Sequence, residues 1–172
     1  EVTIVHAHLE ASLPSGARAV SAPSAQEMHD VMMAEQSSHD IVIMAAAVAD
    51  WRVREPSEDK ISKAGQGDSW SPDLVRTPDI LRELGVHKTP SQLLVGFAAE
   101  TDADEKVREQ SARTKRETKG ADVIVLNQVG RTIGFGTLDT AVTLISASPQ
   151  SLSFEGSKTS VAGRLLDALP EH

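Results

Sequence analysis

The sequence predicts one α/β domain with a mostly parallel sheet, helices on both faces and an antiparallel hairpin near the C-terminus. Two observations predict it: short apolar runs alternate with amphipathic stretches, and the connections between them are short. Such alternation is typical of right-handed, Rossmann-like βαβ units. The chain has 172 residues, of which 40% are hydrophobic, which is enough for one domain with a real core.

The first part of the chain contains three predicted strands and one helix. Apolar runs at residues 2–5 and 17–20 predict the first two strands. Ser24 and Glu27 have the spacing of a capping box, which predicts that a helix begins there. Residues 40–44 show no polar–apolar alternation, so we expect a parallel strand that is buried on both faces.

The middle of the chain changes character. Residues 50–73 are rich in charged, Gly, Ser and Pro residues, which predicts a long mobile loop. Thr77 is then expected to cap a short helix, with Pro78 at its first position and Gly85 at its end. Residues 93–97 predict another buried strand.

The last part of the chain continues the alternation. A strongly charged helix is predicted at residues 102–119 and is ended by Gly120. The remaining predicted elements are a strand at 122–126, two hairpin strands at 140–146 and 151–154, and a final helix capped by Ser157.

Composition excludes several classes of protein. Seventeen Lys and Arg against 25 Asp and Glu give a net charge of −8, which argues against a non-specific nucleic-acid binder. The chain has no cysteine, so it has no disulfide, thiolate metal site or Cys nucleophile. Its longest apolar run, residues 41–49, is too short to span a bilayer, and no secretory signal is visible. We therefore expect a cytoplasmic protein with no membrane partner.

Ligands of parallel α/β sheets bind beyond the carboxyl ends of the strands. Small residues at 45–49 follow one predicted strand and would let a ligand approach the backbone closely. Asp50 ends this run and could bind a ribose hydroxyl or a metal-bound water. Tight helix-on-sheet packing, followed by a solvated Asp50, is the alternative interpretation.

Basic residues elsewhere suggest an anionic ligand. Lys60 and Lys63 lie in the long loop, where a lysine could close over a phosphate, or could simply be solvated. Arg108, Lys115 and Lys119 share one helix face by their spacing. This stripe fits a nucleoside triphosphate, and equally fits an exposed helix with surface ion pairs.

Other motifs give little. His6 and His8 are two apart on a strand and could bind a metal, although the sequence shows no third ligand. The sequence contains no GxGxxG, Walker A or Ser-His-Asp pattern. Composition and spacing alone therefore predict only a parallel α/β domain with an anionic ligand.

Five segments, taken in order, point to a family. They are the runs DIVIMAAAVADWR at 40–52, KISK at 60–63, TPDIL at 77–81, VGFAAET at 95–101 and ARTKRETKGADVIVLN at 112–127. Together they resemble phosphopantothenate–cysteine ligase, the synthetase domain of a bacterial bifunctional coenzyme A biosynthesis flavoprotein. The order and the gaps between the segments make the resemblance specific.

The resemblance implies a two-step ligation. The 4′-phosphopantothenate carboxylate attacks the α-phosphate of CTP, giving an acyl-cytidylate, and the cysteine amine then displaces CMP. Mg2+ is expected with the triphosphate, its ligands being unknown. The implied cytidine-binding residues are Met44, Ala45, Ala46, Asp50, Pro78, Asp79, Ile80, Leu81 and Phe97.

Four further residues take roles from the resemblance. Lys115 and Lys119 belong with the nucleotide, and Lys60 is the loop lysine that closes over the reaction centre. Ala47 corresponds to a family position near the phosphopantothenate and the dimer interface. The resemblance also implies a homodimer that works with, or is fused to, a flavin-dependent decarboxylase, so we expect no FMN in this domain.

The chain departs from the family pattern at three places. The family begins with a further strand and helix, which carry a glycine-containing phosphate loop and an active-site asparagine. We therefore interpret residues 1–172 as one ligase domain that lacks this unit, the gap being filled by a longer polypeptide or by another copy. Ser62 replaces a frequent lysine, and residues 138–140 replace an acid-x-Asn pattern.

Two other functions stay open at this point. The first is a nucleotide-binding remnant that binds CTP without catalysis, which the missing phosphate loop would explain. The second is a dinucleotide-binding oxidoreductase domain of the same architecture, against which the absence of GxGxxG counts.

Overall fold

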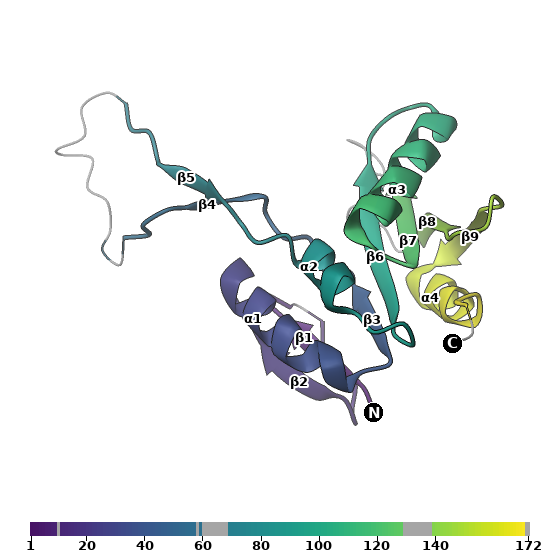
Figure 1. The fold of residues 1–172 in the computed structure, drawn as a ribbon, viewed down its shortest axis with the longest axis horizontal. Coiled ribbons are helices and arrows are strands. Elements are labelled where there is room, and N and C mark those ends of the chain that lie inside the picture. Colours follow the sequence, from purple (N-terminus) through teal and green to yellow (C-terminus); the bar gives the residue numbers. More distant parts are fainter. Residues whose placement is uncertain (10, 58, 60–68, 129–138, 171–172) are drawn as a thin grey trace. The chain divides into compact units, whose positions relative to one another are not determined.

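The computed structural model describes residues 1–9, 11–57, 59, 69–128 and 139–170. It confirms the α/β class (Figure 1). The chain divides into two compact units, each described separately below. The first unit comprises Glu1–Val31 and Ala47–Asp79, and the second comprises Met32–Ala46 and Ile80–His172.

The second unit contains a five-stranded sheet. Its strands are β3 (Ile41–Met44), β6 (Leu93–Glu100), β7 (Val123–Gln128), β8 (Asp139–Ile145) and β9 (Leu152–Ser157), in that spatial order. β3, β6 and β7 are parallel, whereas β8 and β9 pair antiparallel to their neighbours. The parallel half and the C-terminal hairpin are therefore both confirmed.

Helices cover both faces of this sheet. α4 (Lys158–Asp167) packs its Val161 against a core cluster of β-strand residues. The strand residues of that cluster are Leu93, Val95, Val123, Val125, Val142 and Leu144. α2 (Ile80–His87) covers the other face, because a Cβ built on Gly96 would lie 2.5 Å from Leu81 Cδ2, and Gly96 alternates with Val95. α3 (Glu105–Lys119) contacts β6, β7 and β8.

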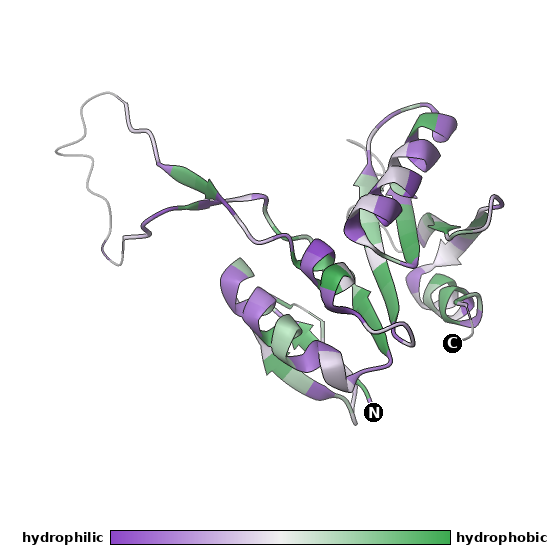
Figure 2. Cartoon of the chain, viewed as in Figure 1, coloured by the Kyte–Doolittle hydropathy of each residue, from purple (hydrophilic) through white to green (hydrophobic). Residues whose placement is uncertain are grey.

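The strand at 41–44 differs from the prediction. We expected burial on both faces, but β3 alternates: Val42 and Met44 are buried, whereas Ile41 is 50% exposed and Ile43 44% exposed. The physical reason is its position, since β3 is the edge strand among the described residues, and α4 contacts β8 and β9 at the opposite edge. Apolar residues are nevertheless concentrated in β3, β6 and β7 (Figure 2).

The first unit begins with β1 (Thr3–His6) and β2 (Arg18–Ser21), which pair in parallel and confirm the first two predicted strands. The capping box at the start of α1 (Ala25–Glu35) is also confirmed. The Ser24 N–H donates to Glu27 Oε2 at 2.9 Å, and the Glu27 N–H donates to Ser24 Oγ at 3.2 Å.

The segment predicted to be a loop at 50–73 carries secondary structure at its base. β4 (Trp51–Val53) and β5 (Leu74–Arg76) form a two-stranded antiparallel ribbon. Arg76 lies over the Trp51 ring at 5.5 Å, and Arg54 Nε donates to Asp73 Oδ2 at 2.6 Å. These cross-strand pairs stabilise a ribbon that the polar composition of the segment concealed.

The predicted bounds of α2 are wrong at both ends. Thr77 does not cap it: the Thr77 N–H donates to the Asp50 carbonyl and its Oγ1 to the Ala49 carbonyl, and the helix begins at Ile80. Gly85 lies inside the helix, where a Cβ would come within 1.9 Å of the Lys119 carbonyl oxygen. This glycine therefore allows a close approach to α3 rather than a stop.

Two other helix boundaries match the sequence. Gly120, with φ of 65°, ends α3 in the left-handed conformation, although α3 begins at Glu105 after an Asp104 cap rather than at residue 102. Ser157 caps α4 by accepting a hydrogen bond from the Ser160 N–H.

Candidate functional site

Three parallel strands of the second unit end at the same edge of its sheet. Met44, the last residue of β3, pairs in register with Gly96, and Asn127 near the end of β7 pairs with Ala99. Met44 is buried, whereas Ala45 and Ala46, which follow it, are exposed. This edge is where a ligand of a parallel sheet is expected to bind.

The end of β6 presents different side chains on its two faces. Phe97 is 39% exposed and pairs with Val125, so it lies on the face covered by α4. Glu100 lies on the opposite face, where it contacts α3. The structure thus places Phe97 and Lys115 at one end of the sheet, but on opposite faces.

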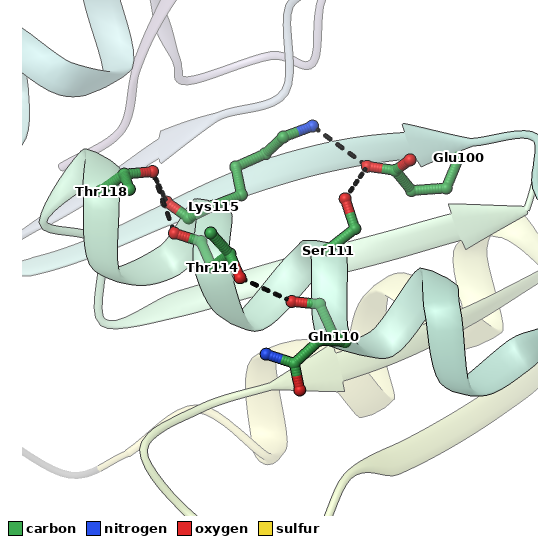
Figure 3. Close-up of polar contacts among 6 residues, drawn as sticks. All are labelled: Glu100, Gln110, Ser111, Thr114, Lys115 and Thr118. Atoms are coloured by element: carbon green, nitrogen blue, oxygen red, sulfur yellow. Dashed lines mark hydrogen bonds and ion pairs between the residues drawn. The ribbon is translucent and has the colours of Figure 1, made fainter.

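Glu100 holds Lys115 in place. Its Oε1 accepts a hydrogen bond from Ser111 Oγ at 3.1 Å and lies 3.3 Å from Lys115 Nζ (Figure 3). The Glu100 and Lys115 side chains are only 22% and 33% exposed. Partial burial strengthens such a pair relative to one in full contact with water.

Two of the three basic residues of the α3 stripe line a common hollow. Lys115 and Lys119 both line a shallow hollow of about 670 Å³ along α3, together with Ser111 and Thr118. Arg108 instead donates to the Asp102 and Ala103 carbonyls at 2.7 and 2.9 Å and does not line this hollow. Two cations of the stripe, rather than three, therefore remain as candidates for one ligand.

Ile80 and Leu81, from the segment that resembles a cytidine-binding motif, have packing roles in the structure. Ile80 is 3% exposed. Leu81 lies directly over Gly96, as the close approach of its Cδ atoms shows. Leu81 packs α2 against the sheet and Ile80 is buried, so any contact with a nucleotide would come from the exposed surface around them.

The first unit holds the remaining candidates. The two hydrogen bonds of Thr77 join the segment containing Ala49 and Asp50 to the segment that leads to Pro78. Ala47, Asp50 and Asp79 are exposed, and Pro78 is half-buried. Lys60 and its neighbour Lys63 lie outside the described residues.

Two titratable groups elsewhere, His6 and Asp30, have hydrogen-bond partners of their own. Within the part of the chain that the structure describes, no group of three or more metal-ligating side chains is found, and His6 Nδ1 contacts the Ala7 carbonyl at 3.1 Å. On α1, hydrogen bonds from His29 and then Gln26 hold the pKa of the Asp30 carboxyl below its usual value. The Asp30 side chain is exposed and belongs to the helix surface.

Glu100, Ser111 and Lys115 together form one cluster, called the Lys115 cluster. Sequence analysis missed two of its members. Glu100 stood inside a quoted motif without a role, and Ser111 was not singled out. Only the helical spacing could be read from the sequence, because Ser111 and Lys115 are four residues apart on α3, whereas their contact with Glu100 at the end of β6 is tertiary.

Comparisons with known proteins show the family to which this chain belongs. Residues 1–171 match the family model of the DNA/pantothenate metabolism flavoprotein C-terminal domain. The chain belongs to this family.

The curated relatives that this chain resembles are coenzyme A biosynthesis bifunctional proteins CoaBC. The protein from Vibrio vulnificus is 37% identical over 144 residues, covering 83% of this chain and 35% of its own length. That from Mycolicibacterium smegmatis is 37% identical over 163 residues, covering 91% of this chain and 39% of its own. The chain thus spans well under half the length of these relatives.

Solved structures agree with the flavoprotein family. A crystal structure of the C-terminal domain of a CoaBC protein superposes with a TM-score of 0.76 at 30% identity, covering 97% of this chain and 71% of that one. A Cab2 mutant in complex with phosphopantothenate-cysteine gives 0.63 at 16% identity, covering 88% and 53%, and supports the fold alone. Among the described helices, none has both the length and the apolar composition needed to cross a membrane.

Proposed function

We propose that this chain is a ligase domain of coenzyme A biosynthesis that joins 4′-phosphopantothenate to cysteine with CTP. The family match over residues 1–171, together with CoaBC relatives, is the observation that carries the proposal. The three parallel strand ends and the Lys115 cluster supply a physically reasonable place for an anionic nucleotide.

The reaction has two steps. A carboxylate oxygen of 4′-phosphopantothenate bonds to the α-phosphorus of CTP, and pyrophosphate leaves with the electron pair of the broken P–O bond. The cysteine nitrogen then bonds to the activated carbonyl carbon, CMP leaves, and the amine gives up a proton. Catalysis consists mainly of positioning and of stabilising negative charge on phosphorus and on the carbonyl oxygen.

The residues of this chain divide these tasks. Ala45 and Ala46 allow close approach of the nucleotide to the backbone, and Asp50 accepts hydrogen bonds from the ribose. Phe97 forms an apolar wall at the strand ends. The remaining residues of the proposed nucleotide site are Met44, Pro78, Asp79, Ile80 and Leu81, of which Ile80 and Leu81 contribute by their packing, which positions the exposed surface around them.

Cations and partners complete the proposal. Lys115 and Lys119 bind phosphate oxygens, and Lys60 closes over the reaction centre. Mg2+ would neutralise phosphate charge when bound; because it commonly binds through substrate phosphates and one or two carboxylates, no ligand in this chain is assigned to it. Ala47 lies near the phosphopantothenate and a homodimer interface, and a flavin-dependent decarboxylase acts on the product.

We further propose that a strand pairs with the outer edge of β3. Within the described residues, β3 is an edge strand, and its Ile41 and Ile43 side chains are about half exposed. An unpaired, apolar edge is unfavourable in an isolated protein. A strand–helix unit with a phosphate loop, in the full-length protein, would cover it.

Two measurements on the full-length protein test the function. Calorimetry with CTP and Mg2+ should show binding. Pyrophosphate release should require phosphopantothenate, and cysteine should be needed for more than one turnover per site. Binding without release would favour a nucleotide-binding remnant. Absence of CTP binding would contradict both, and tight NAD binding would point to the oxidoreductase alternative.

A further inference from the structure

The Lys115 cluster has a feature that an ordinary surface ion pair lacks. One carboxylate oxygen, Oε1, receives two donors from α3: the Ser111 hydroxyl and the Lys115 ammonium (Figure 3). These donors are four residues apart and so project from the same side of the helix. The carboxylate is therefore held by a second contact, independent of the lysine.

Holding Lys115 in advance has an energetic consequence. A lysine side chain loses rotamer entropy when it is fixed in one place. In this protein Glu100 fixes it before any ligand arrives. An ammonium has three N–H donors, and the contact with Glu100 engages one of them.

The cluster lies where a ligand of the sheet is expected to bind, so the held ammonium can contact that ligand. Glu100 is the last residue of β6, at the edge of the sheet where the three parallel strands end. Lys115 also lines the hollow along α3. A cation at this point faces the region where the phosphates of a nucleotide are expected to lie.

We propose that Glu100 is a positioning residue, which holds the Lys115 ammonium at the end of β6 for the phosphates of the nucleotide. Ser111 orients the Glu100 carboxylate for this task. This inference rests on the proposed function, because it takes the ligand to be a nucleoside triphosphate. It makes Glu100 act through Lys115 rather than by contact with the reacting atoms.

Substitutions of Glu100 in the full-length protein separate positioning from charge. Glu100→Gln keeps an acceptor oxygen for both donors, so its Kd for CTP should stay within about threefold of wild type. Glu100→Ala removes the acceptor and should raise the Kd for CTP about tenfold, because the Lys115 side chain gains conformational freedom that it must lose again on binding. Unchanged or tighter CTP binding by Glu100→Ala would overturn the proposal, since it would mean that the carboxylate only repels the phosphates.

A double-mutant cycle tests whether the effect passes through Lys115. In a Lys115→Met background, Glu100→Ala should change the CTP Kd by less than twofold. Glu117→Ala is the matched control and should leave the Kd for CTP unchanged, because Glu117 is an exposed glutamate on the same helix that does not line the hollow. Additive effects of the Glu100 and Lys115 substitutions would overturn a positioning role.

A measurement without nucleotide keeps the two proposals distinguishable. Acetylation of Lys115, followed by mass spectrometry, should be at least threefold faster in Glu100→Ala, with Lys106 on the same helix as the internal reference. An unchanged Lys115 rate would overturn the inference while leaving the proposed function intact. Failure of the wild-type protein to bind CTP would overturn both.

Discussion

At the scale of single residues, the loop lysine carries the sharpest prediction. Lys60→Ala in the full-length protein should lower the rate of pyrophosphate release about 10²- to 10³-fold, because a cation that stabilises charge in the transition state is removed. The Kd for CTP should change by less than about threefold, since the ground state makes little use of that cation. Stopped-flow pyrophosphate assays and calorimetry measure the two quantities.

Lys63→Ala is the matched control for this prediction, because Lys63 lies three residues along the same segment. It should leave turnover within about threefold of wild type. Equal losses in both variants would mean that the segment contributes only general positive charge. Normal turnover by Lys60→Ala would remove Lys60 from the reaction centre.

The residues of the candidate site could be predicted only in part. The small residues after β3 and the lysines of α3 follow from strand-end and helix-spacing rules, so the sequence alone singled them out. Glu100 has no such signature, since its importance comes from a tertiary contact between β6 and α3. The packing of Ile80 was hidden for the same reason.

At the scale of elements, the contact between α2 and α3 depends on glycine. A Cβ at Gly85 would lie 1.9 Å from the Lys119 carbonyl oxygen, which belongs to backbone and cannot move aside cheaply. Gly85→Ala should therefore lower the free energy of unfolding by about 2 kcal/mol or more, despite the better helix propensity of alanine. Urea unfolding followed by circular dichroism measures this change.

The matched control is Gly163→Ala in α4, where a Cβ would have no neighbour within 4 Å. This substitution should raise stability by up to about 1 kcal/mol through helix propensity alone. If both variants were stabilised, α2 and α3 would not approach as closely as described.

A pair of buried amides joins the beginnings of β3 and β6. Gln92 Nε2 donates to the carbonyls of Gln36 and His39 at 2.7 and 2.6 Å, and Gln36 Nε2 donates to Gln92 Oε1 at 3.0 Å. Gln92→Ala should cost about 2–4 kcal/mol, because it leaves buried polar groups without partners and opens a cavity. Gln110→Ala, on the exposed side of α3, should stay within about 0.5 kcal/mol in the same urea titration. Equal stability of the two variants would contradict a structural role for the amide pair.

Most helices and strands could be predicted from the sequence, but the start of α2 and the burial of β3 could not. Period and capping predicted most elements, since these signals are local. The start of α2 was misplaced because Thr77 bonds to residues 49 and 50, far away in the sequence. β3 has the composition of a fully buried strand, yet its neighbours in the described structure cover only one face.

At the scale of the whole molecule, this half-covered strand leads to the last prediction. Ile43 is 44% exposed on β3, and the proposed additional strand–helix unit would cover it. Residues 1–172 contain no cysteine, so labelling of an Ile43→Cys substitution can be assigned to this position by mass spectrometry of its peptide, whatever other cysteines the full-length protein has. Its thiol should react with a maleimide at least tenfold more slowly in the full-length protein than in the 172-residue chain. Val86→Cys, at a site that is 72% exposed, should react fast in both, and Leu94→Cys, at a fully buried site, slowly in both. Equal fast rates for Ile43→Cys would contradict the additional unit, whereas protection of the 172-residue chain that grows with concentration would indicate that a second copy covers β3.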